Sequence, residues 1–498
     1  MAQGSKSLSE LGLTARSARD AQVTGLAVDS RAVRSGDLFA ALPGTTVHGA
    51  RFIGTALGAG AVAVLTDAEG ARIAADDLAG TGAALVIAAD PRQTLAFTAA
   101  LWFGAQPETL VAVTGTNGKT SVASFARQIW QELGHRAVSI GTTGVEGDWH
   151  APLAHTTPEP VTLHRILAGA AEAGVDFAAM EASSHGLDQR RLDGVRLVAA
   201  AFTNITQDHL DYHASFDDYF AAKAGLFARV LPEDGTAVIN IDDPRGVDVL
   251  AMAKARGQEV ITVGRGAADL CLEGQRYDAT GQDLRFSWKG KIRQERLDLI
   301  GGFQAENVAL AAGLVIASGS DPDDVFDMLP LLTTVRGRMQ LSATRDNGAA
   351  VFVDYAHTPD AVAKACTALR PHVMGRLVAV IGAGGDRDRG KRPLMGRAAA
   401  EAADMVIVTD DNPRSENPAT IRAAVLSGVD STMGADVHEV GDRAEAILRG
   451  VDALGPGDAL LICGKGHETG QVVGDTVYPF DDVEQASVAV AALEGRAS

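Results

Sequence analysis

The stretch Val113-Thr-Gly115-Thr-Asn-Gly118-Lys119-Thr120-Ser121 is the strongest indication of how this chain folds. It follows an apolar run at 110–114 that predicts a buried strand, and it leads into 119–133, which predicts a helix. Glycines between a strand and a helix let backbone N–H groups surround phosphate oxygens, and the helix N-terminus favours an anion. The stretch therefore predicts a phosphate-binding loop, with a structural turn as the alternative.

The polar side chains of this loop suit a nucleotide. Lys119 can reach the outer phosphates, and the Thr120 hydroxyl can bind Mg²⁺. The standard eight-residue motif has glycine where this chain has Val113, so the match is incomplete. The expected nucleotide-binding residues of the loop are Gly115, Thr116, Asn117, Gly118, Lys119, Thr120 and Ser121.

Strand and helix patterns alternate along the rest of the chain. Further short β-type runs lie at 176–181, 198–203, 351–354, 377–381, 405–409 and 459–463. Helical, often Ala-rich stretches separate them, which predicts the α/β class with largely parallel sheets. A linker at 104–107 and a break at 331–336 divide the chain into three expected domains, 1–104, 105–334 and 335–498.

Composition narrows the possible functions. The chain has 498 residues and a formal charge of −19, which argues against a nucleic-acid partner because phosphate backbones attract clustered Lys and Arg. Its three cysteines have no CxxC spacing, so we expect neither a disulfide framework nor a zinc site. No apolar run approaches the ~18 residues that span a bilayer. We expect a cytoplasmic protein that does not bind membranes.

A second glycine cluster, Gly382-Ala-Gly-Gly-Asp-Arg387, also follows a predicted strand. A dinucleotide-binding fingerprint would have its third glycine where Arg387 stands. The nearest acidic residue after the next strand, Asp410, does not have the usual placement. NAD binding is therefore not expected here.

Several motifs follow the loop in a fixed order. They are Glu181-Ala-Ser-Ser-His-Gly-Leu, Thr203-Asn-Ile-Thr-Gln-Asp-His209-Leu-Asp, Tyr-Phe-Ala-Ala-Lys223-Ala, Gln-Ala-Glu-Asn307-Val-Ala, Arg336-Gly-Arg338-Met and Asp354-Tyr-Ala-His357-Thr-Pro. Together with the shortened TGTNGKT loop, this order resembles the Mur ligase family, whose members are ATP-dependent amino-acid-adding enzymes of peptidoglycan synthesis. The resemblance covers nearly the whole chain. It implies a UDP-sugar-binding first domain, a phosphate-loop central domain and a Rossmann-like third domain.

The resemblance also implies the chemistry. In this family ATP phosphorylates a substrate carboxylate, an amine attacks the acyl phosphate, and phosphate leaves. Glu181 and His209 match magnesium ligands of the family, with Thr120. Lys223 matches a lysine that reacts with CO₂ to form a carbamate, because an ammonium cannot ligate Mg²⁺. An ordinary surface lysine on a helix is the alternative for Lys223.

Three residues match family positions that contact ATP. Asn307, on a helix expected to begin near Gln304, matches the adenine-contacting asparagine. Arg338 and Asp354 match groups that the third domain directs to the phosphates and to the ribose. For His357 two roles are possible: a contact to ATP, or a capping or core position without such a contact. Because two domains would hold ATP, closure of the third domain is expected to complete the site.

The segment Asp411-Asn412-Pro413-Arg414 resembles the DNPR motif of those family members that add meso-diaminopimelate. Lysine-adding relatives lack the arginine. A guanidinium can pair the distal carboxylate of diaminopimelate through two parallel hydrogen bonds, and lysine has no such carboxylate. Arg387, Gly464 and Glu468 match the remainder of that pocket, with Glu468 on the distal ammonium. A plain helix-entry turn is the alternative for the Asn-Pro pair.

The muramoyl substrate has fewer matching positions. The resemblance implies contacts to UDP-N-acetylmuramoyl-L-alanyl-D-glutamate from Ser30, Thr45, Thr46, Thr156, Thr157, Ser183, Gln189 and Arg191. Arg191 has the clearest physical role because the substrate is anionic. The neighbouring Arg190 leaves open which of the two arginines makes the contact.

These observations predict a monomeric ligase that joins meso-diaminopimelate to the D-glutamate γ-carboxylate, using ATP and Mg²⁺. A lysine-adding ligase and a folylpolyglutamate-synthase-like ligase are the enzyme alternatives. A nucleotide-binding scaffold without catalysis is the third. Arg414 argues against the lysine-adding ligase, and the first domain and the DNPR segment argue against the folylpolyglutamate-synthase-like ligase. The scaffold without catalysis is opposed by the joint presence of Lys119, Glu181, His209 and Lys223.

Overall fold

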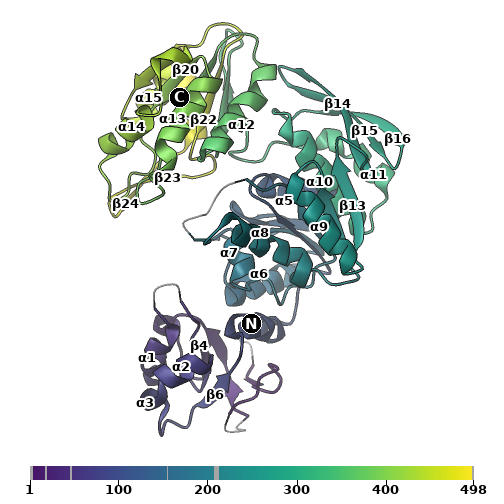
Figure 1. Cartoon of the computed structure of the whole chain (residues 1–498), viewed down its shortest axis with the longest axis vertical. Helices are drawn as coiled ribbons and strands as arrows, with labels where there is room; N and C mark the ends of the chain where they lie inside the picture. Colours follow the sequence, from purple (N-terminus) through teal and green to yellow (C-terminus); the bar gives the residue numbers. More distant parts are fainter. Residues whose placement is uncertain (1–3, 17–19, 45–46, 154, 207–211, 496–498) are drawn as a thin grey trace.

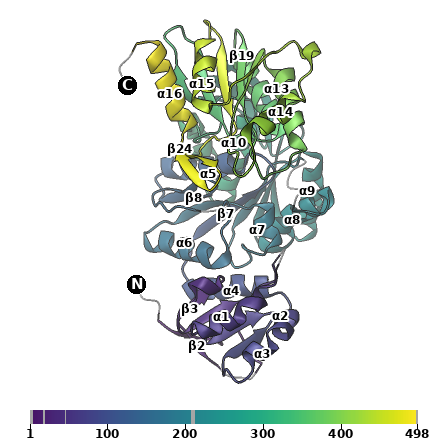
Figure 2. The same ribbon diagram turned by 90° about the vertical axis from the view of Figure 1, so that its left-hand side faces the viewer.

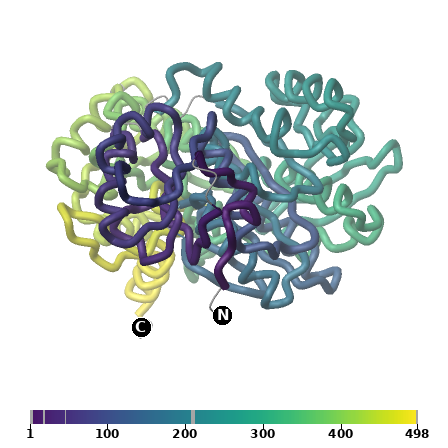
Figure 3. The backbone as a smooth tube through the Cα atoms, turned by 90° about the horizontal axis from the view of Figure 1, so that it is seen from below, coloured from purple at the N-terminus to yellow at the C-terminus, as the bar shows by residue number. Residues whose placement is uncertain are grey.

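The computed structural model describes residues 4–16, 20–44, 47–153, 155–206 and 212–495. Three α/β units follow one another along the long axis, with the N-terminal unit at the bottom of Figure 1 and the C-terminal unit at the top. Seen along that axis in Figure 3, the N-terminal unit lies in front of the other two. This arrangement confirms the expected three-unit α/β fold. Among the helices of these ranges, none combines the length and the apolar character needed to cross a bilayer.

The N-terminal unit is a four-stranded parallel sheet in the order β3-β4-β5-β6, with a short antiparallel pair β1–β2 beside it. Its elements are β1 (Lys6–Ser7), β2 (Gln22–Val23), β3 (Gly25–Ala27), η1 (Ser30–Ala32), β4 (Asp37–Ala40), η2 (Gly49–Phe52), α1 (Ile53–Gly58), β5 (Ala63–Thr66), α2 (Ala68–Ile73), α3 (Ala75–Leu78), β6 (Ala84–Ile87) and α4 (Pro91–Phe103). Helix α4 has clear boundary signals: the Asp90 side chain accepts from Gln93 N, Pro91 takes the first position, and Gly104 ends the helix at φ 76°.

The central unit contains a ten-stranded sheet in the order β16-β15-β14-β13-β12-β11-β7-β10-β8-β9. Its elements are β7 (Thr109–Thr114), α5 (Lys119–Glu132), β8 (Ala137–Gly141), β9 (Gly144–Gly147), α6 (Pro160–Glu172), β10 (Phe177–Glu181), α7 (Ser184–Asp188), β11 (Ala199–Phe202), α8 (Phe216–Gly225), the π-helical η3 (Leu226–Val230), β12 (Thr236–Asn240), α9 (Pro244–Ala255), β13 (Glu259–Gly264), β14 (Leu270–Asp278), β15 (Gly281–Trp288), β16 (Lys291–Leu297), α10 (Phe303–Ala317), α11 (Pro322–Asp327) and η4 (Leu329–Leu331). Neighbouring strands pair in parallel along the order β8-β10-β7-β11-β12-β13-β14, and β9 pairs antiparallel with β8 at one edge. At the other edge β14, β15 and β16 form an antiparallel extension that the sequence patterns had not indicated.

Strand β7 lies in the middle of this sheet and is buried on both faces. Val111 and Val113 pack into a core with α5 and α10, while Leu110 and Ala112 pack into a second core on the opposite face. Alternate residues of a strand face opposite sides of a sheet, so a continuous apolar run is what a central strand requires. The loop that follows β7 is therefore held at the carboxyl edge of a rigid sheet.

The C-terminal unit is a six-stranded sheet in the order β17-β18-β22-β19-β20-β21, parallel except for β17, and it carries a separate hairpin β23–β24. Its elements are β17 (Gln340–Thr344), β18 (Ala350–Asp354), α12 (Pro359–Leu369), η5 (Arg370–His372), β19 (Leu377–Ile381), α13 (Lys391–Ala402), β20 (Met405–Val408), α14 (Pro418–Leu426), η6 (Ser431–Met433), β21 (Asp436–Glu439), α15 (Arg443–Asp452), β22 (Ala459–Cys463), β23 (Gly470–Val473), β24 (Thr476–Pro479) and α16 (Asp482–Leu493). Figure 2 shows this unit above the central sheet, with the hairpin on the side that faces α5 and β8.

Candidate active site

The predicted phosphate loop joins β7 to the first turn of α5. Gly115 and Gly118 have φ values of 148° and 90°. A Cβ at Gly115 would lie 1.9 Å from Thr203 Oγ1, and one at Gly118 would lie 2.4 Å from Asn307 Oδ1. Both positions therefore require glycine, for backbone angle and for space. A strand, a glycine loop and a helix N-terminus in this order fit a phosphate group.

Two lysines from different helices converge on this loop. Lys119 Nζ, in the first turn of α5, donates to Gly115 O at 2.9 Å and to Thr116 O at 2.8 Å. Lys223 Nζ, near the end of α8, donates to the same Gly115 O at 2.7 Å. Lys223 is 1% exposed and lies 4.6 Å from the centre of the Tyr219 ring. The alternative of a surface lysine is therefore wrong.

The segment after β11 supports the phosphate loop from the side. Thr203 Oγ1 donates to Asn117 O at 2.6 Å, and Asn204 Oδ1 accepts from Asn117 N at 3.1 Å. Thr206 N donates to Thr116 Oγ1 at 3.0 Å. This segment belongs to a motif of the sequence, but no role was predicted for Thr203 or Asn204. Their signal was their place at the carboxyl end of a strand beside β7.

The structure describes two of the predicted magnesium-binding side chains, Glu181 and Thr120, as well as Lys223. Glu181 ends β10 beside the loop and is 2% exposed. Its Oε1 accepts from Thr142 N at 2.7 Å, and its Oε2 accepts from Thr142 Oγ1 at 3.2 Å. Thr120 is buried at the start of α5. His209 lies outside the described residues. A buried carboxylate and a hydroxyl at the mouth of a phosphate loop form a donor set of the kind that Mg²⁺ prefers.

The third unit reaches the loop through an arginine. Arg338 Nη2 donates to Thr120 Oγ1 at 3.0 Å, and the guanidinium lies 4.6 Å from the centre of the Tyr355 ring. Asp354 fixes the turn that carries this arginine, because its two carboxylate oxygens accept from Met339 N at 2.7 Å and from Ala356 N at 2.8 Å. Burial raises the pKa of Asp354. Asp354 thus stabilises this turn, and its contact to the ribose of ATP stays a prediction.

A second contact between the units involves Asp360, which sequence reasoning missed. Asp360 Oδ2 accepts from Asn117 Nδ2 at 3.4 Å and from Thr206 Oγ1 at 3.2 Å. Asp360 lies in the first turn of α12, only six residues beyond Asp354. An acidic residue at a helix N-terminus is ordinarily explained by the helix dipole, so nothing in the sequence indicated that Asp360 contacts the loop.

The remaining predicted nucleotide residues lie close to the loop. Asn307 is buried in the first turns of α10, its Nδ2 donates to Gln304 Oε1 at 3.0 Å, and its Oδ1 faces Gly118. Ser121 is buried in α5. His357 Nδ1 contacts Tyr355 O at 2.9 Å, which is a local structural bond.

The predicted amino-acid pocket assembles at the carboxyl edge of the third sheet. Asp411, Asn412, Pro413 and Arg414 follow β20, and Arg387 lies in the glycine loop after β19. Arg414 has a left-handed φ of 52°, and its Nη1 donates to Gly385 O at 2.7 Å. A Cβ at Gly384 would lie 2.9 Å from Arg414 Nη1 and 3.8 Å from Arg387 Cγ, so both arginines border this glycine.

The other side of this pocket comes from the turn after β22. Glu468 Oε2 accepts from Asn412 Nδ2 at 2.9 Å. Gly464 has a φ of 117°, and a Cβ there would lie 2.5 Å from Asp411 Oδ2. The structure therefore brings together the arginines, the amide and the carboxylate that lie on three separate segments of the sequence.

The predicted muramoyl contacts form a row that begins at Glu181. Thr157 Oγ1 donates to Glu181 O at 2.9 Å and accepts from Ser183 N at 3.0 Å. Arg191 donates to Thr157 O at 2.5 Å and to Gln189 Oε1 at 2.8 Å. Thr156 Oγ1 is 3.0 Å from Thr142 Oγ1. The row extends toward the N-terminal unit, where Ser30 lies in η1, and Thr45 and Thr46 are outside the described residues.

Arg191, rather than Arg190, lines a small cavity between the N-terminal and central units. This cavity has a volume of about 70 Å³ and is also lined by Val28, Arg92, Glu159 and Gln189. Burial lowers the pKa of Arg191. Arg190 instead pairs with Asp90 at 3.1 Å.

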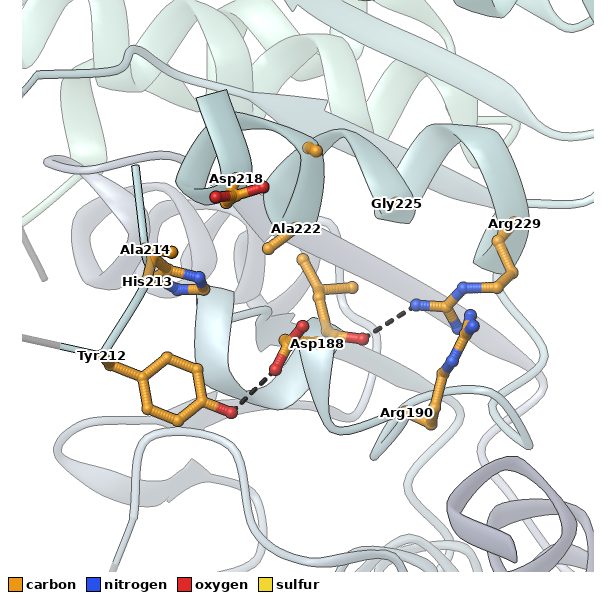
Figure 4. Close-up of a pocket in the computed structure, with 11 residues that line it drawn as sticks. Asp188, Arg190, Tyr212, His213, Ala214, Asp218, Ala222, Gly225 and Arg229 are labelled. Atoms are coloured by element: carbon orange, nitrogen blue, oxygen red, sulfur yellow. Dashed lines mark hydrogen bonds between the residues drawn. The ribbon is translucent and has the colours of Figure 1, made fainter. Parts of the chain in front are cut away.

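A larger hollow of about 790 Å³ lies between α7 and α8. In Figure 4, Tyr212 contacts Asp188 and Arg229 reaches a backbone oxygen, at 2.7 Å and 2.8 Å respectively. Arg190 lies opposite Arg229. Tyr212 OH also accepts from Gln189 Nε2 at 3.1 Å, so this hollow adjoins the muramoyl row without containing any of its residues.

Comparisons with known proteins agree with this geometry. Family models match in three consecutive blocks: the Mur ligase family catalytic domain at 22–101, the Mur ligase middle domain at 113–315, and the Mur ligase glutamate ligase domain at 337–466. A solved structure of a UDP-N-acetylmuramoyl-L-alanyl-D-glutamate–2,6-diaminopimelate ligase superposes with a TM-score of 0.71 at 34% identity, covering 99% of this chain and 100% of that one.

Curated relatives are closer in sequence. The UDP-N-acetylmuramoyl-L-alanyl-D-glutamate–2,6-diaminopimelate ligase of Bradyrhizobium diazoefficiens is 51% identical over 478 residues, covering 94% of this chain and 95% of that one. The enzyme of the same name from Caulobacter vibrioides is 48% identical over 485 residues, covering 96% and 97%. With its phosphate loop, its converging lysines and its three matching domains, the chain belongs to the Mur ligase family.

Proposed function

We propose that this chain joins meso-diaminopimelate to the D-glutamate γ-carboxylate of UDP-N-acetylmuramoyl-L-alanyl-D-glutamate, with hydrolysis of ATP to ADP and phosphate. The observation that carries the proposal is the pocket of Arg387, Arg414 and Glu468 in the unit whose Arg338 contacts the phosphate loop. The guanidinium groups of Arg387 and Arg414, together with the Glu468 carboxylate, suit an amino acid whose far end bears both a carboxylate and an ammonium. The names of the relatives agree with this substrate pair.

The reaction proceeds in two balanced steps. The γ-carboxylate oxygen attacks the terminal phosphorus of ATP, which forms an acyl phosphate and releases ADP. The amine of diaminopimelate then attacks the acyl carbon, loses a proton, and expels phosphate as the amide forms. Lys119 and the backbone N–H groups of the loop stabilise the negative charge on the transferring phosphoryl group.

Thr120, Glu181 and His209 would hold Mg²⁺, which supplies charge neutralisation between phosphate and carboxylate oxygens. Lys223 would join them as a carbamate. The side chain is 1% exposed beside the loop, and the uncharged amine is the form that would react with CO₂. The carbamate would convert a cation into an anion with two oxygens, next to the loop.

We infer that one chain suffices for this reaction, since the central and C-terminal units of the same chain already meet at the phosphate loop. A monomer that works in the cytoplasm is the simplest form: ATP is available there, and all three cysteines are free thiols. The muramoyl nucleotide would extend along the Thr157–Arg191 row toward the N-terminal unit, with Arg191 facing an anionic group.

The test is phosphate release from ATP in the presence of the UDP-muramoyl dipeptide and a panel of amino acids. We expect release with meso-diaminopimelate and much slower release with L-lysine or L-glutamate. Faster release with L-lysine would establish the lysine-adding alternative. Release that depends on a folate and glutamate would contradict the proposal at the level of substrate class.

A further inference from the structure

The amino-acid pocket contains a fully buried cation that no contact to substrate explains. Lys465 follows β22, and its side chain is 0% exposed. Its Nζ donates to Glu468 Oε2 at 3.0 Å, to Asn412 Oδ1 at 3.2 Å and to Gly470 O at 2.5 Å. An ammonium has three protons, and each has an acceptor here. Burial of a charge is costly without such partners, so the site is built around this lysine.

Lys465 fixes which way the Asn412 amide faces. Asn412 Oδ1 accepts from Lys465 Nζ and, at 2.9 Å, from Val472 N. A flipped amide would direct its NH₂ group at two donors. The Asn412 Nδ2 is thereby turned to Glu468 Oε2, at 2.9 Å. Glu468 is then held at one oxygen by two donors, and 32% of its side chain is exposed.

The same lysine ties together the segments that carry the pocket arginine. Its three acceptors come from the loop after β20, the turn after β22 and the start of β23. Strand β23 in turn pairs with Arg414, whose N donates to Val472 O at 3.0 Å and whose O accepts from Gly474 N at 2.8 Å. These backbone bonds hold Arg414 in its left-handed conformation. Loosening of the hairpin would therefore also release the guanidinium.

Charge gives the lysine a second effect. Glu468 would attract any distal ammonium, including that of L-lysine. Because Lys465 adds a positive charge beside Glu468, the singly charged distal end of L-lysine is repelled there, whereas the distal ammonium and carboxylate of diaminopimelate together carry no net charge. Discrimination by repulsion of the wrong substrate is a common way to obtain specificity.

We propose that Lys465 is a positioning and specificity-determining residue: it orients Asn412, Glu468 and the β23–β24 hairpin, and it disfavours amino acids with a distal ammonium but no distal carboxylate. The inference rests on the proposed function, since it concerns the amino-acid pocket of that ligase. Lys465 acts through these neighbours rather than on reacting atoms.

The test compares the wild-type chain with Lys465→Met, which keeps the length of the side chain and removes the charge. Lys465→Gln is the second variant, since it keeps N–H donors without the charge. The control is Arg376→Met, which removes an ion-paired cation of the same unit, bound to Asp458 at 2.9 Å near the start of β19. Phosphate release is measured with meso-diaminopimelate and with L-lysine, and folding is checked by circular dichroism and thermal unfolding.

For either folded variant we expect KM for diaminopimelate to rise at least tenfold, while KM for ATP stays within twofold. We expect the ratio of kcat/KM for diaminopimelate to kcat/KM for L-lysine to fall at least tenfold, and the control to keep the wild-type ratio. Equal losses for both amino acids would overturn the inference, and so would failure of both variants to fold, since either result assigns Lys465 to stability alone. A wild-type chain inactive with diaminopimelate would instead reject the proposed function.

Discussion

Lys119 and Lys223 donate to the same acceptor, the carbonyl oxygen of Gly115, at 2.9 Å and 2.7 Å. One lysine comes from the helix that begins at the loop, and the other comes from α8, more than 100 residues later in the chain. Two like charges on one carbonyl are stable only where other groups compensate them. The lysine proposed to bind phosphate and the lysine proposed to form a carbamate therefore lie side by side at the loop.

Lys119→Ala is expected to abolish turnover without unfolding the chain. Removal of one group that stabilises transition-state charge costs on the order of 10²–10³ in rate. Phosphate release at saturating substrates measures the loss. Lys254→Ala, which removes an exposed lysine of α9 in the same unit, should retain wild-type activity. Near-normal release from Lys119→Ala would reject the phosphate-loop assignment.

Lys223→Ala is expected to be nearly inactive and to recover in part when a short carboxylic acid such as formate or acetate is added. The acid would supply oxygens in the space that the carbamate leaves. Lys223→Arg keeps a cation but cannot form a carbamate, so it should be inactive and should not respond to the acid. An unmodified ammonium at Lys223 in a crystal structure with magnesium and ATP would count against the carbamate.

Asp360→Ala is expected to raise KM for ATP by about 2- to 10-fold and to change kcat less. Asp360 joins the third unit to the loop through two long hydrogen bonds, of 3.4 Å and 3.2 Å, which together contribute about 0.5–1.5 kcal/mol. Lys364→Ala is the matched control. Lys364 is half exposed and pairs with Asp360 at 2.9 Å, and such surface pairs contribute little. An equal effect of both substitutions would show that the ion pair, and not the contact between units, is responsible.

The sequence was sufficient for the fold class and for the strands that carry the site. Strand runs such as 377–381 and 459–463 are continuous apolar segments, and the structure has β19 and β22 there. The antiparallel strands β14–β16 were not predicted from the sequence. They are half exposed and carry many charges, so they contain no continuous apolar run.

The site itself was predictable where a residue belongs to a motif beside a strand end, as for Glu181 and Arg414. It was not predictable where a role depends on contact between distant segments. Asp360 and Lys465 are examples. Each is an ordinary charged residue in the sequence, and only the packing of the third unit brings Asp360 to Asn117, and Lys465 to Asn412.

Stability is expected to fall as the pH is lowered from 7 to 5, in part because of His164. This side chain is fully buried in α6, and neither ring nitrogen has a hydrogen-bond partner among the described residues. Burial, with a smaller effect of Arg196, lowers its pKa from 6.5 to about 4. The unfolded chain therefore binds a proton between these values that the folded chain does not, so stability is lost as the pH falls below 6.5.

The His164 contribution at pH 5 is about 2 kcal/mol. His164→Leu should remove this part of the pH dependence of the free energy of unfolding, measured by urea denaturation at pH 7.5 and pH 5. His438→Ala, which removes a half-exposed histidine of β21, should leave it unchanged. An identical pH dependence in His164→Leu and the wild type would contradict the assignment.

We expect the third unit to select diaminopimelate by its distal carboxylate. Arg414 reaches the Gly384–Gly385 loop where Arg387 also lies, so its truncation removes one of the two guanidinium groups of the clamp. Arg414→Ala should lower transition-state binding of diaminopimelate by ~2–5 kcal/mol, which is roughly 30- to 5000-fold in kcat/KM. L-Lysine has no distal carboxylate, so its weak use should change little.

The most direct measurement is therefore the ratio of kcat/KM for meso-diaminopimelate to kcat/KM for L-lysine, in the wild type, in Arg414→Ala and in Arg397→Ala. Arg397 is an exposed arginine of α13 and serves as the control. General damage to the enzyme lowers both values and leaves their ratio intact, which separates a pocket role from a helix-entry turn. We expect the ratio to fall by at least 30-fold in Arg414→Ala and to stay at the wild-type value in Arg397→Ala. An unchanged ratio in Arg414→Ala would contradict this expectation.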